Sequence, residues 1–106
     1  MSYDATLNLT DDTARIRLMG ELDYQAALQF QTLVEGLVKE EIGRLVLLAQ
    51  ELEYMASAGL RVLVFAKQKM GPKVDVYVVG AREMVRETIQ KAGFDHSVYL
   101  VDTEPA

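Results

Sequence analysis

The sequence predicts an α/β fold: a mixed, mainly parallel sheet with an N-terminal hairpin and crossover helices, in the order β-β-α-β-α-β-α-β. Three observations carry this prediction. At the start of the chain, two consecutive segments alternate apolar and polar residues. Helical and strand-like hydrophobic periods then alternate along the chain, and a glycine follows two of the helical segments. Strands that alternate with helices form parallel sheets with right-handed crossovers.

The hairpin is predicted from two segments with a period of two. Residues 3–9 alternate apolar and polar side chains, and residues 14–18 repeat this with Arg15 and Arg17 facing away from the apolar side. Such alternation is typical of strands with one buried face. A turn at residues 10–12 joins the two strands.

The first helix is predicted directly after Asp23. Apolar residues recur there at three- and four-residue steps, the period of a helix with one buried face. They are Ala26, Ala27, Phe30, Leu33, Val34 and Leu37. Asp23 is a candidate N-cap, whose carboxylate accepts a hydrogen bond from a free backbone N–H.

The middle of the chain is predicted as the central strand and second helix. Residues 45–49 are all apolar, which favours a strand covered on both faces at the centre of the sheet. Residues 50–53 are polar and are predicted as a connection. The second helix begins near Ser57 and ends at Gly71, because glycine takes the left-handed conformation common after helices and Pro72 cannot continue the helix.

The last third of the chain repeats the alternation. Residues 74–78 form a strand pattern, a helical period then ends at Gly93, and residues 98–101 are a short final strand before a polar tail, 102–106. The apolar positions of the third helix are Val85, Ile89 and Ala92. With no linker or repeat, residues 1–106 are predicted to form a single domain.

Charge and composition exclude several function classes. The chain has 11 basic and 16 acidic residues, a net charge of −5, which repels the phosphate backbone of nucleic acids. No apolar run exceeds five residues, whereas a membrane span needs about 18. The chain has no cysteine and its start has no signal-peptide pattern, so we expect a cytoplasmic protein that binds neither nucleic acid nor membrane.

Catalytic and metal-ligating patterns are sparse. His96 is the single histidine and no glycine-rich phosphate loop is present, so His96 is interpreted as a solvated loop residue. Glu40 and Glu41, like Glu51 and Glu53, lie in polar connections without a sign of burial and are interpreted as solvated. We therefore predict no catalytic residue, no metal and no cofactor.

The start of the second helix consists of small residues, Ala56, Ser57, Ala58 and Gly59. Glycine in a first helical turn costs about 0.5–1 kcal/mol relative to alanine, so Gly59 indicates close approach by the backbone or a partner. Free N–H groups and the helix dipole favour an added negative charge at this end. Ser57 itself has two interpretations, as the N-cap of the helix or as a functional residue.

The neighbours of this segment also have two interpretations each. Tyr54 and Met55 are either an exposed docking surface, with an aromatic anchor and an adaptable thioether, or core packing beneath the helix. Asp23 is either an N-cap alone or also a contact residue. The candidate rim residues are Gly59, Leu60 and Arg61.

Two short motifs then carry a family resemblance. Residues 56–60, Ala-Ser-Ala-Gly-Leu, resemble the Asp-Ser-(Ser/Ala)-Gly-Leu motif of the STAS domains of bacterial anti-sigma factor antagonists. Residues 20–23, Gly-Glu-Leu-Asp, look like that family's Gly-x-Leu-Asp turn. The match runs from about Leu7 to Val101 and implies the STAS fold for the whole segment.

The resemblance implies a regulatory binding protein and not an enzyme. Ser57 matches the serine that an anti-sigma factor serine kinase phosphorylates and a PP2C-type phosphatase restores; the unphosphorylated form captures the anti-sigma factor and releases the sigma factor. A phosphate adds about −1.5 to −2 charges and would block docking. The predicted partner-binding residues are Asp23, Tyr54, Met55, Ala56, Ala58, Gly59, Leu60 and Arg61.

Two departures from the family pattern keep an alternative open. Leu48 and Ala56 stand where the family commonly has acidic or amide side chains, at the end of the central strand and just before the serine. The alternative is a phosphorylation-independent STAS scaffold or subunit of a signalling assembly. A third interpretation, an enzyme or small-ligand carrier with Ser57 as nucleophile, lacks an activating base in the sequence. The oligomeric state stays open.

Overall fold

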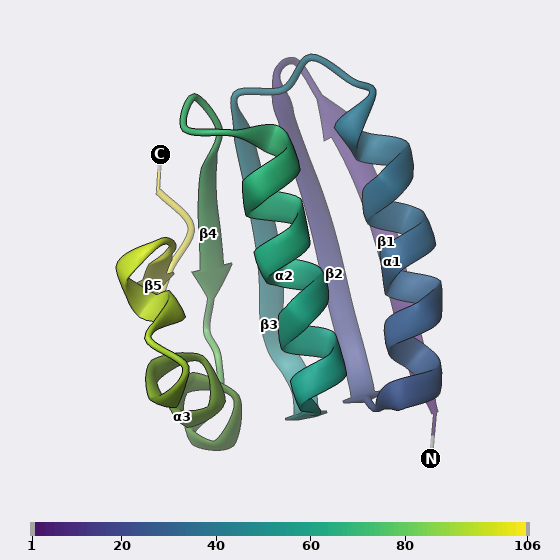
Figure 1. Ribbon diagram of the computed structural model, residues 1–106, viewed down its shortest axis with the longest axis vertical. Coiled ribbons are helices and arrows are strands. Elements are labelled where there is room, and N and C mark those ends of the chain that lie inside the picture. Colours follow the sequence, from purple (N-terminus) through teal and green to yellow (C-terminus); the bar gives the residue numbers. More distant parts are fainter. Residues whose placement is uncertain (1, 106) are drawn as a thin grey trace.

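The computed structural model of the chain describes residues 2–105, and its elements follow the predicted order. The strands are β1 (Tyr3–Thr10), β2 (Thr13–Leu22), β3 (Arg44–Met55), β4 (Asp75–Val79) and β5 (Tyr99–Val101). The helices are α1 (Tyr24–Val38), α2 (Ser57–Met70) and α3 (Glu83–Lys91), with a short 3-10 turn, η1 (Phe94–His96). The sheet order is β1-β2-β3-β4-β5; β1 is antiparallel to β2 and all other neighbours are parallel (Figure 1). The predicted mixed sheet is confirmed.

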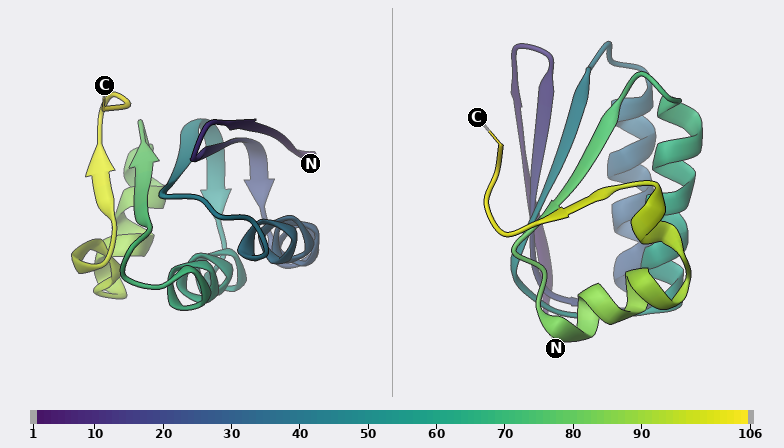
Figure 2. Two further views of the ribbon diagram at one scale, coloured as in Figure 1. Left: turned by 90° about the horizontal axis from the view of Figure 1, so that it is seen from above. Right: turned by 90° about the vertical axis from the view of Figure 1, so that its left-hand side faces the viewer.

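The three α-helices of the described residues lie on one face of the sheet (Figure 2). Each parallel strand is added beside the previous one in the same direction, and right-handed crossovers then place every connecting helix on the same side. The core fills the space between helices and sheet, with Phe30, Leu45 and Leu47 almost fully buried. The predicted central strand is confirmed. The strand was also expected to be covered on both faces. Val46, on the face without helices, is buried, but helices cover only the other face.

β3 is longer than predicted. It continues to Met55, so residues 50–53 belong to a strand and the predicted connection is wrong. β2 also continues, to Leu22, and pairs with this part of β3 past two register shifts. Leu52 and Met55 return to the core while the residues around them are exposed. Pairing with β2 satisfies the backbone hydrogen bonds of residues 50–53. The local sequence pattern of these residues does not reveal that β2 pairs with them.

The helix ends follow the local sequence. The carboxylate of Asp23 accepts a hydrogen bond of 2.9 Å from the backbone N–H three residues on, which confirms it as the N-cap of α1. Gly71 and Gly93 end α2 and α3 as predicted, with φ of 83° and 75°. Gly93 is left-handed, but Gly71, with a ψ of −177°, does not take the predicted left-handed conformation. Two further details differ. Ala92 is exposed at the end of α3, and His96 lies in η1 and not in a loop, although its side chain is exposed as expected.

Candidate functional site

Ser57 is the first helical residue of α2 and lies at the carboxyl end of β3. The N-cap of α2 is Ala56, whose carbonyl accepts hydrogen bonds from the N–H groups of Gly59 at 2.9 Å and Leu60 at 3.2 Å. The interpretation of Ser57 as N-cap is therefore wrong. Ser57 is exposed, and its hydroxyl takes part in none of the side-chain hydrogen bonds found within residues 2–105. Capping does not account for a serine at this place.

The small residue predicted to allow close approach, Gly59, packs inside the protein. A Cβ at this position would lie 2.8 Å from both Cγ and Cδ2 of Leu22 and 3.4 Å from Cγ of Met55. Leu22 is fully buried at the end of β2. Gly59 thus allows the first turn of α2 to pack against Leu22 of β2. The group that lies close to Gly59 is therefore a side chain of the same protein and not of a partner.

The other predicted contact residues divide into exposed and buried side chains. Tyr54 is 40% exposed and Arg61 is exposed, while Ala56 and Ala58 are half-buried. Met55 is only 2% exposed, so core packing is the interpretation that holds for its side chain. Leu60, expected at the rim, is 8% exposed and belongs to the core, so that expectation is wrong. Asp23 is half-buried and engaged as the α1 cap. Only a subset of the predicted contact residues is therefore exposed.

A shallow apolar groove between α1 and α2 adjoins Ser57 and was missed by sequence reasoning. It has a volume of about 280 Å³. Its lining residues are Tyr24, Ala27, Leu28, Gln31, Ala58, Arg61 and Val62. Tyr24 and Leu28 are 66% and 59% exposed although they are large and apolar. Their signal in the sequence is that they belong to α1 but lie outside its periodic core stripe. Exposed apolar groups that gather in a groove mark interaction sites.

The electrostatics at Ser57 favour an anion. The first turn of α2 contains no acidic residue, so the positive end of the helix dipole is not compensated there. Arg61 lies four residues after Ser57, a spacing that places both side chains on the same side of the helix. A phosphate on Ser57 would meet free backbone N–H groups and this guanidinium.

Leu48, the other departure from the family pattern, is not next to Ser57. It lies within β3 and not at its end, since seven further residues of the strand separate it from the helix. At a rise of about 3.3 Å per residue this is about 20 Å. Its neighbours across the sheet are Arg17 and Val79, on the face without helices. Only Ala56, of the two departures, adjoins the serine.

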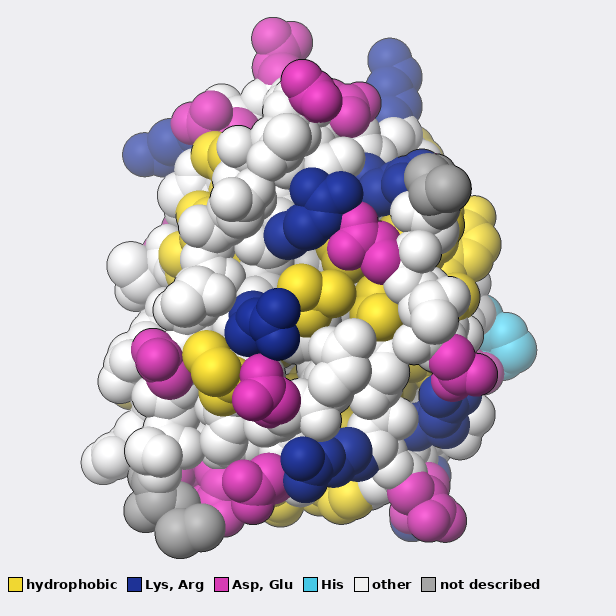
Figure 3. Space-filling model, turned by 180° about the vertical axis from the view of Figure 1, so that it is seen from behind, with side chains coloured by type: hydrophobic (Ala, Val, Ile, Leu, Met, Phe, Trp, Pro, Cys, Tyr) yellow, Lys and Arg dark blue, Asp and Glu magenta, His cyan; other side chains and the backbone are white. Residues whose placement is uncertain are grey.

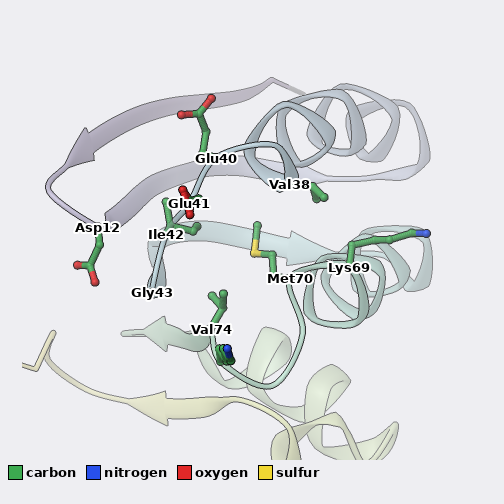
Figure 4. A pocket seen from close by; sticks show the side chains of 10 residues that line it. Asp12, Val38, Glu40, Glu41, Ile42, Gly43, Lys69, Met70 and Val74 are labelled. Atoms are coloured by element: carbon green, nitrogen blue, oxygen red, sulfur yellow. The ribbon is translucent and has the colours of Figure 1, made fainter.

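A pocket larger than this groove lies far from Ser57. It has a volume of about 440 Å³ and is formed by loops where β3 and β4 begin, at the opposite end of α2 from Ser57. Its acidic side chains do not converge, and Asp12, Glu40 and Lys69 point in different directions (Figure 4). Within residues 2–105 there is no group of side chains suited to a metal ion, and no helix has the length and apolar character to cross a bilayer.

Ala56→Asp is expected to stabilise the protein by about 1 kcal/mol. An aspartate there supplies the side-chain acceptor that the N-cap of α2 lacks, and its charge complements the helix dipole. Urea unfolding followed by circular dichroism measures the change. Ala56→Asn is the matched control, since it adds the acceptor without the charge. Destabilisation by both variants would contradict the assigned cap.

Comparisons with known proteins agree with this arrangement. A family model described as the STAS domain matches residues 5–106. An anti-sigma factor antagonist from Mycobacterium paratuberculosis is 24% identical, with a TM-score of 0.87 over 96% of this chain and 87% of that chain. The phosphorylated form of the Bacillus cell fate determinant SpoIIAA is 19% identical, with a TM-score of 0.77 over 95% and 92%. The STAS domain of a SulP transporter from Vibrio cholerae is 23% identical, with a TM-score of 0.68 over 91% and 77%.

The solved structures share the fold of this chain at low identity, and the family model spans nearly all of its sequence. The predicted STAS fold is therefore confirmed, with its antiparallel β1–β2 pair and its parallel remainder. The chain belongs to the STAS domain family.

Proposed function

We propose that this chain is an anti-sigma factor antagonist-like binding protein, and not an enzyme, that engages an anti-sigma factor with serine kinase activity and is switched by phosphorylation of Ser57. A PP2C-type phosphatase would reverse the modification. The observation that carries the proposal is the position of Ser57: exposed, first in α2, without a capping role, and beside a helix end that favours an anion. A structural neighbour, SpoIIAA, is described in a phosphorylated form.

The docking surface in this proposal is the groove between α1 and α2 together with Ser57. Tyr24 and Leu28 supply exposed apolar area on one wall, and Ala58 and Arg61 lie on the other. Because Ala58 follows Ser57 directly, a phosphate would stand at the edge of this groove. Its charge and hydration oppose burial of the groove by a partner, so the folded structure need not change for binding to be lost.

Ser57→Asp is expected to weaken binding to the anti-sigma factor kinase of the source organism at least tenfold, a change of about 1.4 kcal/mol, whereas Ser57→Ala should preserve it. Isothermal titration calorimetry with the purified kinase measures both affinities. Incubation with kinase and ATP, followed by mass spectrometry, should place the phosphate on Ser57 of the wild-type chain.

Ser97→Asp is the matched control, because Ser97 is also exposed but lies after η1, near the C-terminal part of α2 and away from the end that carries Ser57. It adds the same charge and should leave the affinity within about twofold, the range usual for surface substitutions. Equal affinities of the Ser57→Asp and Ser57→Ala variants for the kinase would overturn the proposed switch.

The second candidate function is a phosphorylation-independent scaffold or subunit of a signalling assembly. Ala56 favours it, because the family's acidic group directly before the serine is missing. One structural neighbour is the STAS domain of a transporter, so the fold also serves within larger proteins. This candidate predicts partner binding that ignores charge at position 57 and no phosphate on Ser57 after exposure to kinase and ATP.

A further inference from the structure

β1 is an edge strand of the sheet, and half of its backbone hydrogen-bonding groups point away from β2. The carbonyl oxygen of Ser2 accepts a hydrogen bond of 3.1 Å from the N–H of Glu21, which extends the register of β1 and β2 by one pair. In an antiparallel pair, every second residue exchanges hydrogen bonds with the neighbouring strand. The even-numbered residues of β1 therefore face β2. The N–H and carbonyl groups that point to the free edge belong to Tyr3, Ala5, Leu7 and Leu9.

This edge lacks the features that usually prevent edge strands from pairing. Proteins protect such strands by short length, lysine, proline or a bulge. β1 has eight residues in unbroken register with β2, contains no lysine or proline, and has Asp4 as its single charged residue. The Asp4 carboxylate accepts a hydrogen bond of 2.9 Å from the Ala5 N–H, one of the outward-directed groups. The strand is thus suited to pair with a further strand.

The side chains of the outward-directed residues are apolar and only partly covered. Tyr3 and Ala5 are half-buried and pack against the core, whereas Leu7 and Leu9 are 39% and 48% exposed. Figure 2 shows the turn end of the β1–β2 hairpin standing away from the helices. In Figure 3, β1 lies at the left margin, and the middle of this margin carries hydrophobic and uncharged side chains.

A shallow groove lies beside the covered half of β1. It has a volume of about 190 Å³ and is open to solvent between the start of β1 and α1. Its lining residues are Tyr3, Asp4, Ala5, Gln29 and Leu33. β1 therefore presents two exposed leucines at one end and an apolar groove at the other.

We propose that two copies of this chain pair through β1, antiparallel and about a two-fold axis at Thr6, to form one continuous sheet. In this register Tyr3 lies opposite Leu9 of the second copy, and Ala5 lies opposite its Leu7. The outward-directed residues of both copies then exchange backbone hydrogen bonds. The exposed leucines of each copy come to lie beside the groove of the other, so the apolar ends of β1 cover each other.

The opposite face of β1 and its charge favour the same arrangement. Asp4 lies opposite Asn8 of the second copy, which places a carboxylate beside an amide, and the two Thr6 side chains meet at the axis. A parallel pair would instead place the two Asp4 carboxylates side by side, where like charges repel. The strand at the other edge of the sheet, β5, has only three residues and would pair with less of β1.

The proposed dimer leaves the candidate functional site free. The groove with Tyr24 and Leu28 lies between α1 and α2, whereas the free edge of β1 is the outer edge of the sheet and faces away from α2 (Figure 1). The proposal therefore does not depend on Ser57 or on its phosphorylation.

The test uses cysteine, which the chain lacks. Thr6→Cys places the thiols of the two copies opposite each other at the axis, within the span of a disulfide. Asn8→Cys is the matched control, exposed like Thr6 and on the same face of β1. Its two thiols lie four residues apart along the strands, about 13 Å, which is beyond that span. With oxidised glutathione, Thr6→Cys should form linked dimers at least about tenfold faster on non-reducing gels.

Sedimentation equilibrium of the unaltered chain measures assembly without a cross-link. The average mass should rise with concentration from one chain to two. Leu7→Lys places a charge at the paired edge and should raise the concentration needed for assembly at least about tenfold. Met84→Lys is the control, since Met84 is also 39% exposed but lies in α3, and it should leave assembly unchanged.

Three results would overturn the proposal. The first is an equal rate of linking for the Thr6→Cys and Asn8→Cys variants. The second is a mass of one chain at every concentration. The third is a mass that grows beyond two chains, because antiparallel pairing of two β1 edges closes the assembly, whereas pairing of β1 with β5 would continue it.

Discussion

Gly20→Ala is expected to lower the free energy of unfolding by about 2–5 kcal/mol. Gly20 has a φ of +82°, a backbone conformation that costs other residues about 1–2 kcal/mol. A Cβ there would also overlap the carbonyl oxygen of Ser2, which accepts a hydrogen bond of 3.1 Å from the N–H of Glu21. Relief of such an overlap in packed structure costs about 1–3 kcal/mol. Gly20 is thus required by the bulge that leads β2 into α1.

Thermal unfolding measures this loss, which corresponds to a fall in Tm of about 8 °C or more for a chain of this size. Gly71→Ala is the matched control. Gly71 has nearly the same φ, +83°, but nothing lies within 4 Å of a Cβ built on it. Because its ψ is −177°, a region that other residues rarely adopt, Gly71→Ala should cost only a backbone term of about 1–3 kcal/mol. An equal loss in both variants would show that the overlap with Ser2 is unimportant.

Gly59→Ala is expected to destabilise the protein by up to about 2 kcal/mol, although alanine is the better helix former. Overlap with the fully buried Leu22 side chain costs about 1–3 kcal/mol, and the gain in helix propensity of about 1 kcal/mol opposes it. The expected change moves the first turn of α2 away from β2, and with it Ser57. Urea unfolding gives the stability, and the kinase titration shows whether the displaced serine is still recognised.

Gly36→Ala is expected to have the opposite effect on the stability of the protein. Gly36 is exposed within α1, and nothing lies within 4 Å of a Cβ built on it. Alanine there should stabilise the chain by about 0.5–1 kcal/mol through helix propensity and a less flexible unfolded chain. If Gly59→Ala stabilised the protein as Gly36→Ala does, the packing of α2 against Leu22 would be refuted.

The site combines two features that do not require each other. The uncompensated N-terminal end of α2, with Arg61 one turn along, makes a phosphate on Ser57 compatible with the fold. The groove with Tyr24 and Leu28 makes the same place suitable for docking. A modification that is tolerated by the fold and obstructs the groove can switch binding without unfolding, which is the physical basis of the proposed function.

Local sequence determined the order and type of the elements. Periods of two and of 3.6 follow from which face of an element is buried, so the strands and helices could be read directly from apolar positions. The Asp23 cap and the stops at Gly71 and Gly93 were likewise predictable, because each depends on the conformation or hydrogen bonding of one residue. The position of Ser57 at the start of α2 followed from the same reasoning and from the family motif.

Tertiary structure decided what depends on partners distant in the chain. The polar part of β3 is a strand only because β2 runs beside it, and Ser57 is free because Ala56 takes the cap position. Tyr24 and Leu28 become a groove only when α1 and α2 pack side by side, and the Arg15–Glu104 pair joins residues 89 positions apart. Local patterns report which face is buried but not what lies against it, because pairing and packing are set by the whole chain.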